Sequence, residues 1–318
     1  MSHSVLVVMD PIVSIKTKKD TTFALMLEAQ RRHWQVYYCQ PQDLYLTKGH
    51  VFANCQQVQL QDNPDDWFSY IDAAPVEVNC GEFSAILMRK DPPFNMNYIY
   101  STYLLELAQN QGALVVNDPA SLRDCNEKLF TAWFPEHTPK TLVSANPHKL
   151  KAFAKELGDV ILKPLDGMGG ASIFRAKATD PNLSVIIETL TSHGQDLAMA
   201  QQFIPEITEG DKRILIVNGE VIPYTLARIP SKGETRGNLA AGGSGVPMPI
   251  TEEEKAIGEA IAPELVKRGL LFVGLDVIGR YVTEINVTSP TCMRELENEY
   301  HINIGEKLFA ALEQQLMA

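Results

Sequence analysis

Short hydrophobic runs alternate with amphipathic stretches over the first third of the chain. The runs are rich in β-branched and aliphatic residues, as in strands that are buried on both faces of a parallel sheet. They cover residues 5–9, 35–39, 85–88 and 114–116. The stretches 21–32 and 98–109 have helical periodicity, and Asp20 is a suitable N-cap for the first. This alternation predicts an α/β layer with ligands at the carboxyl ends of its strands.

The remaining sequence predicts hairpins and lobes of mixed α and β structure. An apolar strand at 197–204 precedes a strong hairpin over 212–228. Further helices are predicted at 121–128, 147–156, 251–268 and 304–316. Residues 41–80 indicate only short strands and loops. The expected fold class is therefore α/β, with an N-terminal parallel domain followed by α+β lobes.

The length, composition and net charge of the chain limit the kinds of protein that it can be. The 318 residues are too many for one ordinary core, so two or three packed lobes are expected. Hydrophobic residues make up 45% and charged residues 21%, which is the balance of a globular protein. The net charge of −11 argues against a nucleic-acid partner, because nucleic-acid backbones bind basic surfaces. Individual lysines and arginines can still bind small anionic substrates despite this net negative charge.

Cysteine usage and the N-terminal segment point to a reducing compartment. The five cysteines are odd in number and form no CxxC pair, so neither a disulfide framework nor a zinc site is indicated. The apolar run at the N-terminus has only five residues, which is too short for a signal peptide or a membrane span. We therefore expect a cytoplasmic protein with no membrane partner.

The stretch 276–286 carries three side chains with hard oxygen atoms. Glu284 and Asn286 are two residues apart, so on a strand both leave by the same face. Together with Asp276 they suit Mg²⁺ better than zinc. The competing interpretation is that these side chains form the exposed polar face of an edge hairpin. Asp276 faces Glu284 only if the loop has an odd number of residues, for example 279–281, whereas a two-residue loop turns Asp276 to the opposite face.

A glycine loop and a lysine within an apolar strand form a second candidate site. The sequence from Lys163 to Ser172, Lys-Pro-Leu-Asp-Gly-Met-Gly-Gly-Ala-Ser, links strand to strand, unlike a P-loop. Glycines let backbone amides approach phosphates closely, and a buried lysine requires an anionic partner. The alternative is a flexible hairpin without a ligand. Lys128, taken alone, is typical of a surface lysine.

Two arginines are predicted to lie close together on the hairpin over 212–228. Its Asn218-Gly219 pair favours a tight type I′ turn, which places Arg213 and Arg228 on neighbouring strands near the open end. Two guanidinium groups repel each other unless an anion lies between them, so we expect a bound anion there. The following segment, 229–245, contains five glycines and has the length and composition of a lid.

Arg89 directly follows a predicted buried strand. The sequence Arg89-Lys-Asp-Pro-Pro places opposite charges and two prolines at the carboxyl end of that strand, which favours a binding site over a solvated turn. No Ser-His-Asp or Cys-His arrangement for nucleophilic catalysis is evident. Cys125 and Cys292 are interpreted as packing residues.

The ordered set of these features resembles the ATP-grasp carboxylate-amine ligases, and more narrowly the bacterial glutathione synthetase family. The resemblance covers essentially the whole chain except 41–80. The stretches that carry it are 9–11, 88–94, 121–133, 161–172, 228–243 and 283–291. It implies an N-terminal domain at 1–123, a central ATP-grasp lobe at 124–204, and a C-terminal lobe at 205–318 with its lid at 229–245.

The resemblance also implies a role for each candidate residue. Residues expected to bind ATP are Lys128, Lys163, Gly167, Met168, Gly169, Gly170, Gln201, Gln202, Phe203, Ile204 and Asp211. Arg213, Arg228 and Arg236 are expected at the reacting groups. Arg89, Asn286, Ser289 and Thr291 are expected to bind substrate, and Asp276, Glu284 and Asn286 to hold Mg²⁺ or Mn²⁺.

The implied reaction joins γ-glutamylcysteine to glycine with ATP, and yields glutathione, ADP and phosphate through an acyl phosphate. Its partners are small molecules, and the family suggests a homotetramer. Two alternatives remain open: another ATP-grasp ligase, such as a D-alanine or peptide-tailing ligase, and a non-catalytic ATP-binding module. The intact metal set and both lysines argue against the second alternative.

Overall fold

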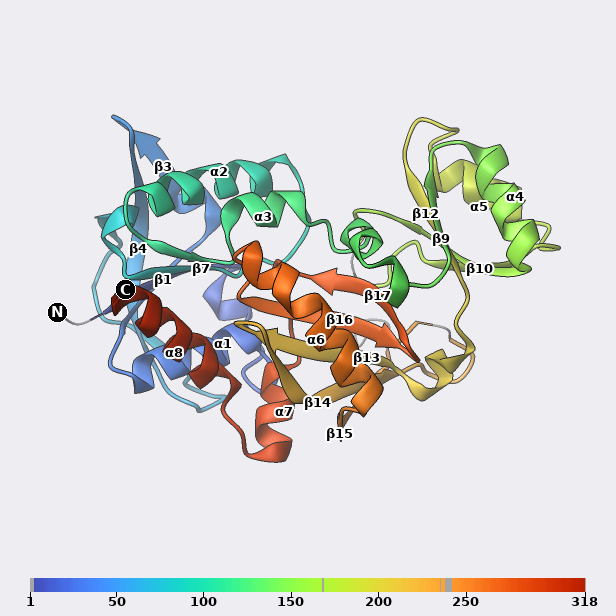
Figure 1. Cartoon of the computed structure of the whole chain (residues 1–318). Coiled ribbons are helices and arrows are strands. Elements are labelled where there is room, and N and C mark those ends of the chain that lie inside the picture. The colour runs from blue at the N-terminus through green and yellow to red at the C-terminus, as the bar shows by residue number, and fades with distance from the viewer. Residues whose placement is uncertain (1–2, 168, 235, 238–241, 318) are drawn as a thin grey trace.

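Three sheets form the framework of the protein in a computed structural model that describes residues 3–167, 169–234, 236–237 and 242–317 (Figure 1). The first has the strand order β3-β4-β2-β1-β7-β8, with β5 and β6 pairing to β4. Its strands are β1 (Ser4–Val8), β2 (Gln35–Cys39), β3 (Leu44–Thr47), β4 (His50–Leu60), β5 (Phe68–Tyr70), β6 (Val76–Asn79), β7 (Ala85–Met88) and β8 (Leu114–Val116). The central strands β2, β1, β7 and β8 are parallel, as predicted.

Helices cover both faces of the first sheet, which explains the unbroken hydrophobic runs of its strands. Leu6 and Val8 of β1 belong to the core under α2 (Met96–Asn110), and Val5 and Val7 belong to the core under α1 (Thr21–Arg31). The C-terminal helix α8 (Ile304–Met317) packs beside α1, although it lies at the other end of the sequence (Figure 1).

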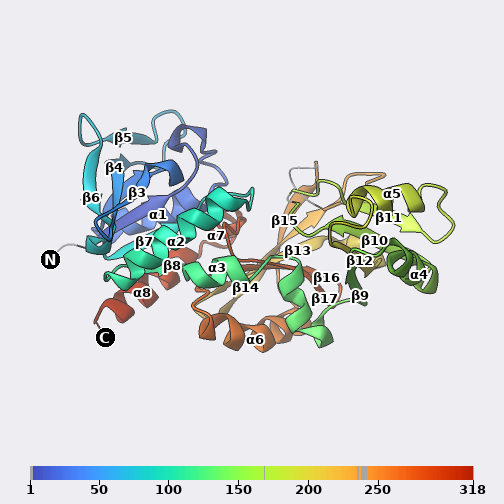
Figure 2. The same cartoon turned by 90° about the horizontal axis from the view of Figure 1, so that it is seen from above.

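The second and third sheets are antiparallel and build the rest of the molecule. The second, in the order β11-β10-β12-β9, contains β9 (Thr141–Ser144), β10 (Asp159–Pro164), β11 (Phe174–Lys177) and β12 (Ala198–Gln202), packed against α4 (Pro147–Leu157) and α5 (Leu183–Leu190). The third, in the order β15-β14-β13-β16-β17, contains β13 (Asp211–Val217), β14 (Glu220–Ile229), β15 (Ser244–Pro249), β16 (Phe272–Ile278) and β17 (Tyr281–Asn286), with α6 (Glu252–Lys267). The small lobe with the second sheet stands apart from the other two (Figure 2).

Two predicted helix boundaries were wrong. The helix expected at 121–128 is α3 (Pro119–Asp124), because Asp118 caps it and Pro119 fixes its first turn. Lys128 lies beyond α3, directly before a short 3-10 helix (Leu129–Trp133). Helix α7 (Met293–Tyr300) was not predicted at all.

Two other segments carry more strand than the sequence indicated. Within 41–80, β4 is eleven residues long rather than a short strand. Both ends of the predicted lid are strand residues, since β14 runs to Ile229 and β15 begins at Ser244. Residues 235 and 238–241 of that segment lie outside the described part of the chain.

One buried amide joins the first sheet to the third. Asn117 follows β8 and is 3% exposed. Its Nδ2 donates to Phe272 O at 2.9 Å and to Val287 O at 2.6 Å, and its Oδ1 accepts from Phe272 N at 2.9 Å. Phe272 begins β16 and Val287 follows β17, so this side chain fixes both outer ends of the β16–β17 hairpin.

In the part of the chain that is described, no helix is long and apolar enough to cross a membrane. All five cysteines are buried and free, Cys125 and Cys292 among them.

We predict that Asn117→Ala destabilises the protein by about 2–4 kcal/mol, because it leaves one buried N–H and two buried carbonyls without partners. Urea unfolding followed by circular dichroism measures this change. Asn182→Ala is the matched control, since the Asn182 side chain is exposed and makes no capping bond. Equal stability of both variants would contradict the proposed role of Asn117 in fixing the β16–β17 hairpin.

Candidate active site

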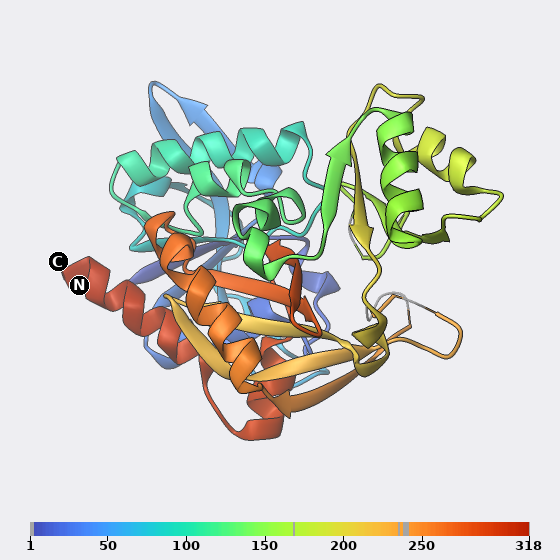
Figure 3. The same cartoon turned by 45° about the vertical axis from the view of Figure 1, so that its right-hand side comes forward.

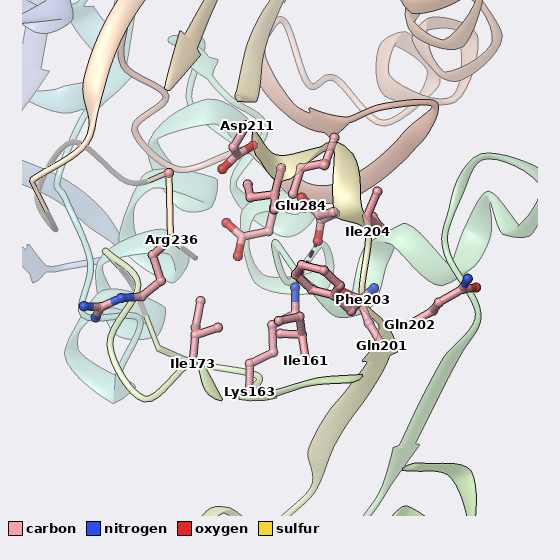
Figure 4. A pocket seen from close by; sticks show the side chains of 14 residues that line it. Ile161, Lys163, Ile173, Gln201, Gln202, Phe203, Ile204, Asp211, Arg236 and Glu284 are labelled. Carbon is pink, nitrogen blue, oxygen red and sulfur yellow. Dashed lines mark hydrogen bonds between the residues drawn. The ribbon is translucent and has the colours of Figure 1, made fainter. Parts of the chain in front are cut away.

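Two cavities meet at Glu284, between the small lobe and the third sheet. The first offers about 640 Å³ of space, part of it open to solvent, and is mostly apolar, with Ile161, Ile173 and Phe203 in its walls (Figure 4). The second encloses about 1580 Å³ and is rich in charged side chains. Glu284 lines both, so a ligand in the first cavity reaches the second at this carboxylate.

A β-bulge sets the orientation of the predicted metal ligands. Strands β16 and β17 are joined by the two-residue turn 279–280, and Ile278 pairs with Tyr281. The expectation that such a turn sends Asp276 to the opposite face was wrong. The register shifts after Asp276, which leaves Thr283 as an extra residue, and Asp276 pairs directly with Glu284.

The carboxylate of Asp276 lies between the two arginines that were predicted to need an anion. Asp276 Oδ1 is 2.5 Å from Arg213 Nε, and its Oδ2 is 2.8 Å from Arg228 Nη2. All three residues are buried, and although burial opposes ionisation, the two guanidinium groups hold the pKa of Asp276 far below its usual range. The anion predicted from sequence is therefore partly supplied by the protein itself.

The donor set still fits a hard cation at Glu284 and Asn286. Asn286 Nδ2 donates to Gly274 O at 3.2 Å, so the amide oxygen is the atom left for a ligand, and both residues line the second cavity. Asp276 lines the same cavity but has both oxygens engaged by arginine. Among the described residues, no three His, Cys, Asp or Glu side chains are arranged to hold a metal ion. A cation here would thus depend on Glu284, Asn286 and ligand oxygens.

Lys128 is buried at the centre of the site rather than on the surface. It is 1% exposed, and its Nζ donates to Glu127 Oε1 at 2.6 Å and to Gly167 O, with Glu284 Oε1 at 3.6 Å. Burial opposes its charge, but the carboxylates of Glu284 and Glu127 raise the pKa of Lys128. Glu127 was missed from sequence. Its only signal was its position next to Lys128.

Lys163 is buried in the first cavity and has almost no partner for its charge. Its Nζ makes one long contact, 3.4 Å to Thr283 O (dashed line in Figure 4). Burial lowers the pKa of Lys163, and the nearby carboxylate of Glu284 only partly offsets this effect. A buried ammonium in this state is costly until an anion reaches it.

The glycine loop closes one side of the site. A Cβ on Gly167 would lie 2.9 Å from Pro164 Cγ and 3.2 Å from Ala171 O, and Gly169 and Gly170 have positive φ. Arg236 Nη1 donates to Gly170 O at 3.2 Å and Arg236 Nη2 pairs with Glu234 at 2.6 Å, so the predicted lid contacts this loop. Met168, also predicted to bind ATP, lies outside the described residues.

The predicted adenine and ribose residues line the first cavity. Gln201, Gln202, Phe203 and Ile204 run along its wall at the end of β12 (Figure 4). Asp211 has one oxygen 2.6 Å from Arg228, while its buried Oδ1 has no partner among the described residues. Burial raises the pKa of Asp211 to about 6, even though Arg228 lowers it. An unpartnered carboxylate oxygen can accept a hydrogen bond from a ligand hydroxyl.

The predicted substrate residues line the second cavity. Arg89 is 6% exposed, and its Nε donates to Thr22 Oγ1 at 3.1 Å and its Nη2 to Pro290 O at 2.9 Å. Ser289 Oγ donates to Arg89 O at 3.3 Å, and Thr291 lies on the same wall. Burial lowers the pKa of Arg89.

Sequence reasoning missed two carboxylates of the second cavity. Glu295 lies in the first turn of α7, and its buried Oε2 has no partner in the described part of the chain. Asp20 was predicted only as a helix cap, which it is, with its Oδ1 2.7 Å from Phe23 N. Burial raises the pKa of both groups. Glu295 could have been placed in this cavity only if α7 had been predicted.

Comparisons with known proteins agree over the whole chain. The model described as prokaryotic glutathione synthetase, N-terminal domain, matches residues 4–123, and that described as prokaryotic glutathione synthetase, ATP-grasp domain, matches 127–301. A glutathione synthetase of Vibrio vulnificus (strain YJ016) is 61% identical over 98% of both chains. One of Escherichia coli (strain K12) is 55% identical over 98% of both chains.

Solved structures with lower identity share the fold. The D-cycloserine synthetase DcsG has a TM-score of 0.66 at 14% identity, covering 98% of this chain and 99% of that one. The D-alanyl-alanine synthetase A of Vibrio cholerae has a TM-score of 0.60 at 12% identity, covering 100% and 99%. The ATP-grasp ligase PsnB, complexed with a minimal precursor, has a TM-score of 0.65 at 18% identity, covering 99% and 100%. The mixed α/β fold is thus an ATP-grasp fold with an N-terminal α/β domain, as predicted.

We predict that Lys163→Met stabilises the ligand-free protein by about 1–3 kcal/mol, since methionine fills a similar volume without a buried charge. The same variant is expected to lose the rise in melting temperature that Mg²⁺ and ATP give the unchanged protein. Differential scanning calorimetry with and without nucleotide measures both. Lys177→Met, at an exposed position of β11, should change neither. A lower stability of Lys163→Met would mean that the charge is already satisfied in the free protein.

Proposed function

The chain belongs to the prokaryotic glutathione synthetase family, and on that premise we propose a role for each part of the active site. Both family models match it, and curated glutathione synthetases are 55–61% identical over 98% of its length. The protein is an ATP-dependent ligase that joins γ-glutamylcysteine to glycine and forms glutathione. ATP and these small molecules are its substrates. The likeness to ligases for other substrates lies at 18% identity or less and concerns the fold alone.

The first cavity is the nucleotide site. Its apolar walls at Ile161 and Ile173 suit an adenine ring, and the chain at 201–204 offers main-chain groups to the ring edge. The unpartnered Oδ1 of Asp211 accepts a ribose hydroxyl. This observation carries the assignment most strongly, because a buried carboxylate oxygen requires a donor from a ligand.

The phosphates extend from this cavity toward Glu284. Lys163 and Lys128 provide two buried ammonium groups there, and the amides of Gly167, Gly169 and Gly170 would cover the phosphates. Phosphoryl transfer requires positioning and charge neutralisation more than a protein nucleophile. Binding of ATP supplies the anion that Lys163 lacks in the free protein.

Glu284 and Asn286 would hold Mg²⁺, with Mn²⁺ able to take its place. When bound, the cation offsets the charge of the ATP phosphates. Asp276 contributes mainly through the arginines, since both its oxygens are engaged by them. Its carboxylate holds Arg213 and Arg228 side by side at the cavity despite their like charge.

Arg213, Arg228 and Arg236 act on the reacting groups. A carboxylate is a poor acyl donor, so the cysteinyl carboxylate of γ-glutamylcysteine first becomes an acyl phosphate, and the glycine amine then attacks it through a tetrahedral oxyanion. Fixed guanidinium groups stabilise the charge that develops on these oxygens. Because acyl phosphates hydrolyse readily, the lid at 229–245, which contains Arg236, excludes water.

The second cavity binds the peptide. Arg89, Ser289 and Thr291 lie on the wall that would receive a substrate carboxylate. Asp20 and the unpartnered Oε2 of Glu295 provide negative charge for the γ-glutamyl ammonium group. A zwitterionic substrate end is recognised by such separated charges of both signs.

Other features of the protein follow from the same premise. We propose domains at 1–123, 124–204 and 205–318, with α8 packing back onto the first. A cytoplasmic location is supported by the five free, buried cysteines. A homotetramer is the proposed assembly.

The assignment of the metal site predicts the effect of Glu284→Gln. The variant keeps the shape of the side chain but removes a charge that offsets a dication, so ADP release with γ-glutamylcysteine and glycine should fall by about 10²-fold or more. Stabilisation of the fold by ATP should no longer depend on added Mg²⁺, as measured by thermal melting. Glu253→Gln, on the exposed face of α6, serves as the control. Turnover of Glu284→Gln at the rate of the unchanged enzyme would exclude this role.

The acyl-phosphate route predicts the fate of one oxygen atom. With ¹⁸O in the cysteinyl carboxylate of γ-glutamylcysteine, one labelled atom should appear in each released phosphate, because the carboxylate oxygen becomes the bridge to phosphorus. Mass spectrometry of the phosphate measures this transfer. Unlabelled phosphate from a productive reaction would rule out the intermediate.

A further inference from the structure

An arginine of the small lobe lies against the ring of Phe203. Arg175 belongs to β11, and its Cζ atom is 3.5 Å from the centre of that ring. The other arginine–ring pairs among the described residues lie at 4.3–5.5 Å. Phe203 follows β12 and lines the first cavity (Figure 4), whereas Arg175 lines neither cavity. The guanidinium group thus supports a ring of the cavity wall without reaching the cavity itself.

Asp159, the first residue of β10, holds both partners of this contact. Arg175 Nε donates to Asp159 Oδ1 at 3.1 Å and to Oδ2 at 3.2 Å, and Arg175 Nη2 donates to Oδ2 at 2.6 Å. The main-chain oxygen of Asp159 accepts from Phe203 N at 3.2 Å. A carboxylate that meets two nitrogens of one guanidinium group fixes its orientation as well as its charge. One residue therefore sets the position of the guanidinium group and of the chain that carries the ring.

The register of β10 with β11 places this ion pair on the face of the sheet that the first cavity uses. Arg175 pairs with Ile161, and directly paired residues of antiparallel strands have their side chains on one face. Asp159 lies two residues before Ile161, so its side chain leaves by the same face. Ile161 lines the first cavity, as does Ile173, two residues before Arg175. The ion pair is therefore a lateral extension of the cavity wall.

Stability alone does not account for an ion pair at this place. The side chain of Arg175 is 36% exposed and that of Asp159 28%, and ion pairs with this exposure contribute little to the free energy of unfolding. Holding a long side chain in one geometry also costs conformational entropy. What the pair secures is the position of an aromatic ring, and a fixed aromatic wall favours the binding of a planar ligand.

We propose that Arg175 is a positioning residue for the nucleotide, and that it fixes the Phe203 ring as the wall against which the purine base packs. Aromatic rings and bases attract each other when they stack or meet edge to face. Because Arg175 occupies one side of the ring, the base meets the part that is turned into the cavity. A ring that is fixed before binding loses little conformational freedom when the base arrives. This inference rests on the assignment of the first cavity to ATP.

The test compares the steady-state kinetics of Arg175→Met with those of the unchanged enzyme. The KM for ATP should rise roughly two- to fivefold, the effect of losing one cation–π contact near the surface, while kcat and the KM values for γ-glutamylcysteine and glycine stay the same. Arg175→Lys should show a smaller rise, because lysine keeps the charge but lacks the planar guanidinium group. Arg123→Met is the matched control and should keep the KM for ATP. Arg123 also pairs with a carboxylate, Glu106, and lies against a ring, Tyr103, but it lines neither cavity.

Two competitive inhibitors locate the effect within the nucleotide. In Arg175→Met the inhibition constant of adenosine should rise by the same factor as the KM for ATP, because the ring faces the base. The inhibition constant of inorganic tripolyphosphate should not change, because the phosphates are held elsewhere. An unchanged inhibition constant for adenosine, or an effect on tripolyphosphate alone, would overturn the proposal.

A double-mutant cycle with Phe203→Leu tests whether Arg175 acts through the ring. Once the ring is replaced, Arg175→Met should raise the KM for ATP no further, whereas two independent effects that multiply would overturn the inference. Should Arg175→Met fail to fold, as thermal melting shows, Asp159→Asn takes its place. That variant weakens the hold on the guanidinium group and should raise the KM for ATP in the same direction, and an unchanged KM there would count against the proposal.

Failure of this inference is distinguishable from failure of the proposed function. An unchanged enzyme that released no ADP with γ-glutamylcysteine and glycine would contradict the function. An Arg175→Met variant that is active and keeps the KM for ATP would contradict only the positioning role.

Discussion

The buried ion cluster of Asp276 with Arg213 and Arg228 is the constraint on which the active site depends. The two guanidinium groups come from neighbouring strands and would repel each other without the carboxylate between them. The carboxylate reaches them because β13 lies between β14 and β16. Removing one member of such a buried group leaves an uncompensated charge, which costs about 3–5 kcal/mol. The cluster thus fixes the order of β14, β13 and β16, the strands that carry Arg228, Arg213 and Asp276.

Much of the fold follows from local sequence patterns. Unbroken apolar runs such as Val5–Val8 predicted parallel strands that are covered on both faces, and the capping residue Asp20 marked a helix start. Some residues of the two cavities were also found from their chemistry, since a lysine in an apolar strand or two arginines on neighbouring strands are costly without a ligand, whereas most of the others came from the family resemblance. Lys163 and Arg213 therefore indicated a ligand-binding site before any of their contacts was known.

Features that depend on pairing between distant strands could not be found in this way. The bulge at Thr283 has no local signal, and it reverses the face on which Asp276 lies. The identity of the anion between the arginines required the register of β13 with β16, which sequence spacing does not contain. Likewise, Glu127 and Glu295 become part of the site only through tertiary contacts. Asp118 could have been recognised, because an acidic residue before proline is a common helix start.

The small lobe has a hydrophobic core of its own and stands beside the rest of the molecule (Figure 3). The first and third sheets share two hydrophobic clusters, whereas the second sheet packs only with α4 and α5. Contacts from the small lobe to the rest include the polar bonds Lys163–Thr283, Leu165–Asn126 and Gly167–Lys128. A ligand can replace such hydrogen bonds with its own at little net cost in free energy. Separating buried apolar surfaces has no such compensation. We therefore expect the small lobe to move as a unit, and two of the donors that hold it, Lys163 and Lys128, are the ones that we propose for the ATP phosphates.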